Sequence, residues 1–153
     1  MRRAEKEITS KKELEIILAK AKICRIGLMD QNHPYIVPLN FGYKNGCLYF
    51  HSAPKGKKID LLKKNKVVCF EVDIDHDIVN TGIPCNWSST YSSIIGCGKA
   101  SLIINSEGKQ KALNIIINQY APGTTYTFPE KNLHDVVIIQ IEITEMTGKT
   151  SKK

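Results

Sequence analysis

The segment His51–Lys58 carries the residue types of a phosphate-binding site. It leaves an expected strand, turns at Gly56 and enters an expected helix, so backbone N–H groups would gather at a helix amino terminus. Ser52 adds a hydroxyl, and Lys57 and Lys58 add positive charge. The segment is not a Walker loop, because it begins with His where that motif has Gly, and Lys58 stands where Ser or Thr should hold magnesium. A solvated turn followed by a basic helix face is the other interpretation of the same residues.

The stretch Tyr35–Tyr43 reads as a strand, because its odd positions are all apolar or aromatic. Pro38 removes a hydrogen-bond donor from this strand, which suits an edge strand or an irregular face. A planar ring could lie against Ile36–Asn40 and take hydrogen bonds from main-chain groups. An edge strand with an ordinary proline explains the same pattern and is favoured by these residues alone.

Other site chemistries have little support in the sequence. The acidic residues Asp73, Asp75 and Asp77 lack the Gly and the distal Glu of a calcium loop, and His76 has no second His at ligand spacing. The five cysteines include no CxxC pair, so neither a zinc site nor a disulfide framework is expected. No Gly-x-Ser-x-Gly elbow is present. We therefore predict no metal site and no hydrolase.

Composition narrows the class of protein further. The chain has 153 residues, and its odd number of irregularly spaced cysteines favours a reducing compartment, so we expect a cytoplasmic protein. No apolar run is long enough to span a bilayer, which predicts no membrane partner. The net charge of +7 raises the alternative of a nucleic-acid-binding β-barrel. We do not favour nucleic acid, because the aromatic side chains are few and those of Tyr35–Tyr43 share the face assigned to the core.

The expected elements describe an α+β domain that is mainly antiparallel β. Helices are predicted after a Ser10 cap, through Ile59 to Asn65, and over 106–120. Strands are predicted over 23–29, 35–43, 47–51, 67–72, 91–104 and 136–144, with a hairpin turn at 44–46 and a long loop over 73–89. This order predicts an antiparallel barrel with helices packed outside. We expect one domain over 1–153, with its core at about 8–148.

Three stretches together resemble the nitroimidazole-resistance proteins of the pyridoxamine 5′-phosphate oxidase-like superfamily. They are Pro34–Tyr43, Leu48–Ile59 and Tyr91–Ala100. The resemblance implies a six-stranded FMN-binding split barrel with flanking helices. It also implies a homodimer with the flavin at the subunit interface. FMN is the expected cofactor, and FAD is the alternative.

The resemblance also implies which residues bind the flavin. The ring would be lined, largely through backbone groups, by Val37, Pro38, Leu39 and Asn40. His51 and Ser52 would approach the ribityl chain and the phosphate. Lys57 and Lys58 occupy the positions of a basic pair on the phosphate, in a register that could slip by one residue. Ser93 would come from the opposite subunit.

The implied function is a flavin-dependent reductase of small electron-poor molecules such as 5-nitroimidazoles, with NADH or NADPH as donor. Vitamin B6 oxidation is not expected, since no Trp- and Arg-bearing segment follows Met146. His51 is the candidate catalytic residue, as a proton or hydrogen-bond donor, or it orients the phosphate end instead. A non-enzymatic flavin carrier or sensor with the same fold is the principal alternative.

Overall fold

A computed structural model describes residues 3–151; the outermost residues of the predicted 1–153 domain lie outside the described range. The strands are β1 (Glu7–Ile8), β2 (Cys24–Asp30), β3 (His33–Leu39), β4 (Gly42–Lys44), β5 (Cys47–Ser52), β6 (Val67–Val79), β7 (Ser88–Ile103) and β8 (Val137–Thr150). The helices are α1 (Lys11–Lys20), α2 (Lys57–Lys64), α3 (Ser106–Asn118) and α4 (Glu130–His134), with short 3-10 helices η1 (Ala4–Lys6) and η2 (Pro84–Asn86).

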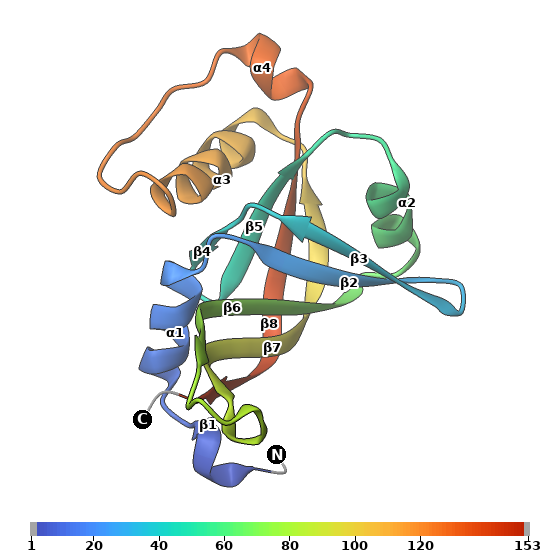
Figure 1. The fold of residues 1–153 in the computed structure, drawn as a ribbon. Helices are drawn as coiled ribbons and strands as arrows, with labels where there is room; N and C mark the ends of the chain where they lie inside the picture. Colours follow the sequence, from blue (N-terminus) through green and yellow to red (C-terminus); the bar gives the residue numbers. More distant parts are fainter. Residues whose placement is uncertain (1–2, 152–153) are drawn as a thin grey trace.

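All pairings between these strands are antiparallel, and they form one sheet in the order β3-β2-β6-β7-β8-β5-β4, with β1 beside β8 (Figure 1). The α+β split-barrel prediction is confirmed. The described residues hold eight strands rather than the six implied by the resemblance, because β1 and β4 add two short ones.

The predicted strand Tyr35–Tyr43 is divided between the two edges of the sheet. Residues up to Leu39 pair with β2, whereas only Gly42–Lys44 pair with β5, so the expected hairpin with β5 is limited to those three residues. Phe41, at the crossing, is fully buried and stacks on Phe50 with ring centroids 6.1 Å apart. The sheet curls because one short crossing joins its opposite edges.

The core fills the inside of this curled sheet. Residues of α1 that follow the Ser10 cap pack into it, and the backbone N–H of Glu13 donates to the Ser10 hydroxyl at 3.4 Å as predicted. A smaller apolar cluster of Ala112, Ile116 and Ile138 lies under α3, on the outer face of the sheet. Helix α3 therefore covers β4 and β5 from outside (Figure 1).

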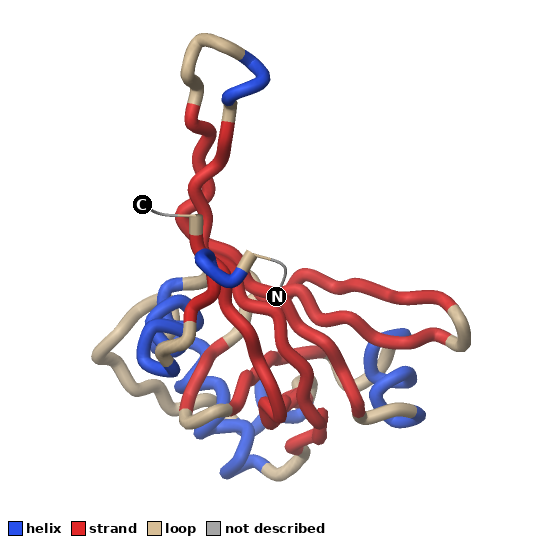
Figure 2. The backbone as a smooth tube through the Cα atoms, turned by 90° about the horizontal axis from the view of Figure 1, so that it is seen from below, coloured by secondary structure: helices blue, strands red, loops and turns tan. Residues whose placement is uncertain are grey.

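The predicted long loop over 73–89 is wrong for most of its length. Strands β6 and β7 continue as a paired hairpin past a register shift between Ile74 and Asp77, and only residues 80–87 connect them. Figure 2 shows this hairpin as an arm that projects from the body, with η2 near its tip. Ile78 and Val79 are both exposed in the single chain, so the arm has no buried face to impose an alternating sequence pattern.

The carboxyl-terminal elements also differ from expectation. Strand β8 runs to Thr150, beyond the predicted end at residue 144, and its Gly148 packs against Leu14 and Ile8. Strand β1 and helix α4 were not predicted from the sequence. Both are too short to produce a clear periodic signal.

Candidate functional site

The junction between β5 and α2 places backbone donors at a helix amino terminus. Gly56 caps α2 with φ of +123°, a conformation that L side chains rarely adopt, and no atom lies within 4 Å of where its Cβ would be. The N–H groups of Ile59 and Asp60 donate to the Gly56 carbonyl. The preceding N–H groups, those of Lys57 and Lys58, have no carbonyl one turn earlier and point out of the helix end.

Lys57 joins this junction to the β2–β3 hairpin. Its Nζ lies 2.8 Å from Oδ2 of Asp30 and 4.6 Å from the centre of the Tyr35 ring. The hydrogen bond between the two side chains raises the pKa of Lys57 and lowers the pKa of Asp30. Helix α2 is thereby held beside β3, the strand that the sequence analysis assigned to the flavin ring.

Ser52 and His51 point in opposite directions from the end of β5. The Ser52 side chain is buried and its hydroxyl donates to the Ala53 carbonyl at 2.9 Å, so it would reach a ligand only by giving up that bond. His51 is exposed on the outer face of β5, the face that also carries Tyr49. Alternation along the strand therefore separates these two predicted site residues.

The four residues predicted to line a flavin ring lie at the end of edge strand β3. Val37 and Leu39 are partly buried, while Pro38 is exposed and lies opposite Arg25 of β2. A proline is tolerated at this edge because only one side of the strand needs ladder donors. The Asn40 amide donates to the Lys22 carbonyl and the Tyr120 hydroxyl, so its side chain anchors the crossing between the sheet edges.

The remaining two predicted residues are placed differently. Lys58 is partly buried in the first turn of α2, beside Lys57. Ser93 lies on β7, between Asp73 of β6 and Lys149 of β8. Ser93 is therefore near the arm and away from the β5–α2 junction of its own chain.

Asp30 and Tyr35 belong to this site but were not predicted. A two-residue turn, Gln31 and Asn32, pairs Asp30 with His33 and leaves the carboxylate at the tip of the hairpin. The turn can be recognised in the sequence. The proximity of Asp30 and Tyr35 to Lys57, however, depends on contacts between segments that are distant along the chain.

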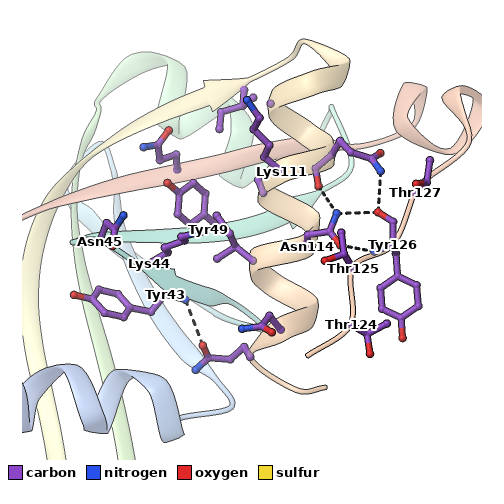
Figure 3. Close-up of a pocket in the computed structure, with 18 residues that line it drawn as sticks. Tyr43, Lys44, Asn45, Tyr49, Lys111, Asn114, Thr124, Thr125, Tyr126 and Thr127 are labelled. Carbon is purple, nitrogen blue, oxygen red and sulfur yellow. Dashed lines mark hydrogen bonds between the residues drawn. The ribbon is translucent and has the colours of Figure 1, made fainter. Parts of the chain in front are cut away.

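A groove lies elsewhere, between α3, the β4–β5 hairpin and the connection before α4 (Figure 3). Its volume is about 1080 Å³, and Tyr43, Tyr49 and Tyr126 are among its lining residues. Asn114 of α3 holds the outer wall by accepting from the N–H of Tyr126 and donating to its carbonyl. None of the predicted flavin-binding residues lines this groove. If the cofactor site is shared by two subunits, a single chain forms only one wall of it and need not show it as a groove. The β5–α2 junction therefore remains the candidate cofactor site.

Within residues 3–151, no group of three or more His, Cys, Asp and Glu side chains is arranged to hold a metal ion. No helix in the same range has the length and apolar character needed to cross a membrane.

Comparisons with solved structures support the description of the fold. A candidate 5-nitroimidazole antibiotic resistance protein from Bacteroides thetaiotaomicron matches with a TM-score of 0.84 and 34% identity, over 94% of this chain and 86% of that one. An FAD-binding protein from Mycobacterium smegmatis matches at 0.62 with 25% identity, over 94% and 96%. An FAD- and heme-binding protein from the same organism reaches 0.87 at 20% identity, over 97% and 74%, which is a likeness of fold.

Sequence comparisons agree. An uncharacterised protein from Rhizobium meliloti (strain 1021) is 29% identical over 65 residues, and the match spans 42% of this chain and 42% of that relative's length. The family model described as pyridoxamine 5′-phosphate oxidase matches residues 10–150, nearly the whole chain. This chain therefore belongs to the pyridoxamine 5′-phosphate oxidase family and, as its sequence motifs indicated, resembles the nitroimidazole-resistance proteins within that superfamily.

Proposed function

We propose that this chain binds a flavin at the β5–α2 junction and, as a homodimer, reduces small electron-poor molecules such as nitroaromatics. The observation that carries the proposal is the position of Lys57, which holds the amino terminus of α2 beside β3. Phosphate-binding groups and an edge strand able to meet a planar ring thus adjoin one another. The relative with 34% identity, described as a candidate resistance protein for 5-nitroimidazoles, supports the substrate class.

The residues present fit a phosphate-bearing flavin. The space beside Gly56 leaves backbone N–H groups approachable, and Lys57 and Lys58 supply the charge that a phosphate needs. The backbone of Val37–Asn40 would meet the ring, with Pro38 and its neighbours providing shape. FMN is the expected form, and FAD is the alternative because a relative of similar length is described as FAD-binding.

A bound flavin would supply the redox chemistry, reduced by NADH or NADPH and reoxidised by the acceptor. The protein's part is to bind, orient and exclude water. His51, exposed beside the phosphate-binding segment, would orient the ribityl–phosphate end or donate a proton to the acceptor. Ser93 would complete the site from the partner subunit, since it lies away from the junction in its own chain.

An absorbance spectrum of the purified protein, followed by titration with FMN and FAD, tests this proposal. A yellow protein that oxidises NADH or NADPH faster than free flavin, with a nitroaromatic acceptor, is the expected result. A flavin carrier or sensor would be yellow without that acceleration. Colourless protein that binds neither flavin would rule the proposal out. If the colourless protein bound DNA with an affinity that falls as the salt concentration rises, the nucleic-acid alternative would replace the flavin proposal.

A further inference from the structure

Two cysteines face each other across the β6–β7 ladder. Cys69 and Cys97 are direct register partners, and their sulfur atoms lie 3.2 Å apart. Cys69 is exposed in the single chain and Cys97 is partly exposed, both on the outer face of the sheet. The other cysteines are separate from this pair: Cys24 is buried in β2, Cys47 meets Gln140, and Cys85 lies in η2.

The backbone around the pair already satisfies the requirements of a disulfide. Directly opposed residues of antiparallel strands have Cα atoms about 4.5–5.5 Å apart, which falls inside the range of about 4.4–6.8 Å found in disulfides. The sulfur atoms are 3.2 Å apart and must still come together to form a bond, which we expect side-chain rotation to accomplish.

The surrounding structure keeps the pair in place and approachable. Across β2, Cys69 faces Gly27, which has no side chain to cover it. On the other side, the β7–β8 register shifts between Cys97 and Gly98, and the Thr144 hydroxyl donates to the Cys97 carbonyl at 3.1 Å. Such bulges often adjoin functional positions, where they set the direction of a side chain.

The surroundings of Cys97 disfavour the ionised form of its thiol. The hydrogen bond with Cys69, burial and the nearby Glu145 carboxylate together raise the pKa of Cys97 to about 11. Cys97 therefore keeps its proton near neutral pH. Because the thiolate is the attacking species and Cys69 is also the more exposed of the two residues, we expect Cys69 to react first.

We propose that Cys69 and Cys97 form a dithiol modification site that closes to an intrachain disulfide by exchange with small disulfides such as glutathione disulfide. The Cys69 thiolate attacks one sulfur of the glutathione disulfide, forms a mixed disulfide and releases one glutathione thiolate. That glutathione thiolate takes the proton of Cys97, and the Cys97 sulfur then attacks the Cys69 sulfur and releases the second glutathione, which takes up the proton lost by Cys69. The two cysteines are oxidised by two electrons, and one glutathione disulfide is reduced to two thiols.

The test is to incubate the protein with glutathione disulfide, to trap its free thiols with N-ethylmaleimide before denaturation, and to measure its intact mass. After the mass of maleimide on its other cysteines is subtracted, the wild-type protein should be lighter by two hydrogens. It should carry no glutathione on the pair and run as a single chain on a non-reducing gel. Cys97→Ser should instead accumulate one glutathione on Cys69. Cys85→Ser, which removes an exposed cysteine outside the pair, should close the disulfide as the wild type does.

A second measurement does not rely on serine variants folding correctly. Phenylarsine oxide condenses with two neighbouring thiols and releases water, so on the reduced wild type it should protect Cys69 and Cys97 together from maleimide. Any of three results would overturn the proposal: a glutathione adduct that persists on wild-type Cys69, a covalent dimer, or Cys69 and Cys97 thiols that still react with maleimide after treatment with glutathione disulfide and with phenylarsine oxide. None of these readouts depends on flavin, so the outcome is independent of the proposed redox function.

Discussion

Lys57 is the residue on which the proposed cofactor site depends, and it already has a partner in the protein. Its ammonium group binds the Asp30 carboxylate in a largely solvent-exposed pair. A flavin phosphate would compete with that carboxylate for the same cation. Lys58 carries no such partner among the ion pairs of residues 3–151, so the two lysines are not equivalent.

Replacing both Lys57 and Lys58 with Ala should weaken flavin binding about 10- to 100-fold, because two charge-assisted contacts to the phosphate are lost. The protein should still fold, since neither side chain belongs to the core. Lys111→Ala is the matched control, because it removes an exposed lysine from another ion pair. Equal flavin affinity in the double variant and the control, measured by fluorescence titration, would disprove the phosphate assignment.

Asp30→Asn should have the opposite effect on affinity. Without the competing carboxylate, Lys57 is free for a phosphate, and flavin should bind about two- to fivefold more tightly, as expected for an exposed ion pair. The difference in flavin affinity between Asp30→Asn and the wild type should shrink at acid pH. The lowered pKa of Asp30 keeps the ion pair intact as the pH falls, but once the wild-type carboxylate is protonated it no longer competes for Lys57. Glu107→Gln, in the Lys111 pair, is the control that should leave affinity unchanged.

His51→Ala separates the two roles proposed for His51. If the imidazole orients the phosphate end, the flavin dissociation constant should rise while turnover per bound flavin stays nearly constant. If it donates a proton, binding should change little and turnover should fall by about 10²–10⁴. We expect the orienting role, because His51 is the first residue of the candidate phosphate-binding segment His51–Lys58. A variant that binds flavin normally but reduces no acceptor would contradict that expectation.

At the scale of elements, the crossing between β3 and β4 depends on a close contact with α3. A Cβ on Gly42 would lie 2.6 Å from the Ile115 carbonyl oxygen and 2.7 Å from Ile116 Cα, both backbone atoms that cannot rotate away. The absence of a side chain at position 42 therefore lets α3 lie against the outer face of β4.

Gly42→Ala should lower the free energy of unfolding by about 1–3 kcal/mol through overpacking, measured as a lower urea midpoint. Gly27→Ala is the matched control in the same sheet, because its nearest neighbours would be 3.8 Å away, an ordinary contact distance. The assigned packing of α3 would be wrong if both substitutions had the same effect.

For the molecule as a whole, the outer face of the β3–β2–β6–β7 sheet carries exposed apolar side chains beside the ion pairs of Arg25 with Glu71 and Asp73. Ile36 is 65% exposed and Ile95 is 60% exposed, and both point away from the core. Register pairs from Ile36 to Gly27, and onward to Cys69 and Cys97, place the thiol pair on this face as well. The proposed dimer would cover part of it.

Ile95→Asp should therefore shift the protein towards monomer in light scattering and lower its flavin content, because a charge would be buried at the subunit contact. Ile104→Asp, at an exposed position beyond β7, is the control and should remain dimeric. A wild-type protein that is monomeric with flavin bound would refute the shared site.

Residues that are close together in the sequence are enough to predict the main elements and to mark His51–Lys58 as a candidate phosphate-binding segment. Local signals sufficed for these: Ser10 caps α1, the odd positions of 35–43 face inward, and Gly56 precedes a basic helix. Each signal depends on residues only a few positions apart, so it can be recognised without knowing the fold. The resemblance to a family then supplied the split-barrel topology, which the structure confirms.

The tertiary structure is needed to know where strands end, which side chains meet and which remain exposed. Three features depend on residues that are distant along the chain. They are the break at Asn40–Phe41, the long β6–β7 arm and the ion pair of Lys57 with Asp30. The contact between Cys69 and Cys97 likewise requires the register of two strands. Such contacts depend on how the whole sheet curls to bury its core, and no local pattern of residues encodes that geometry.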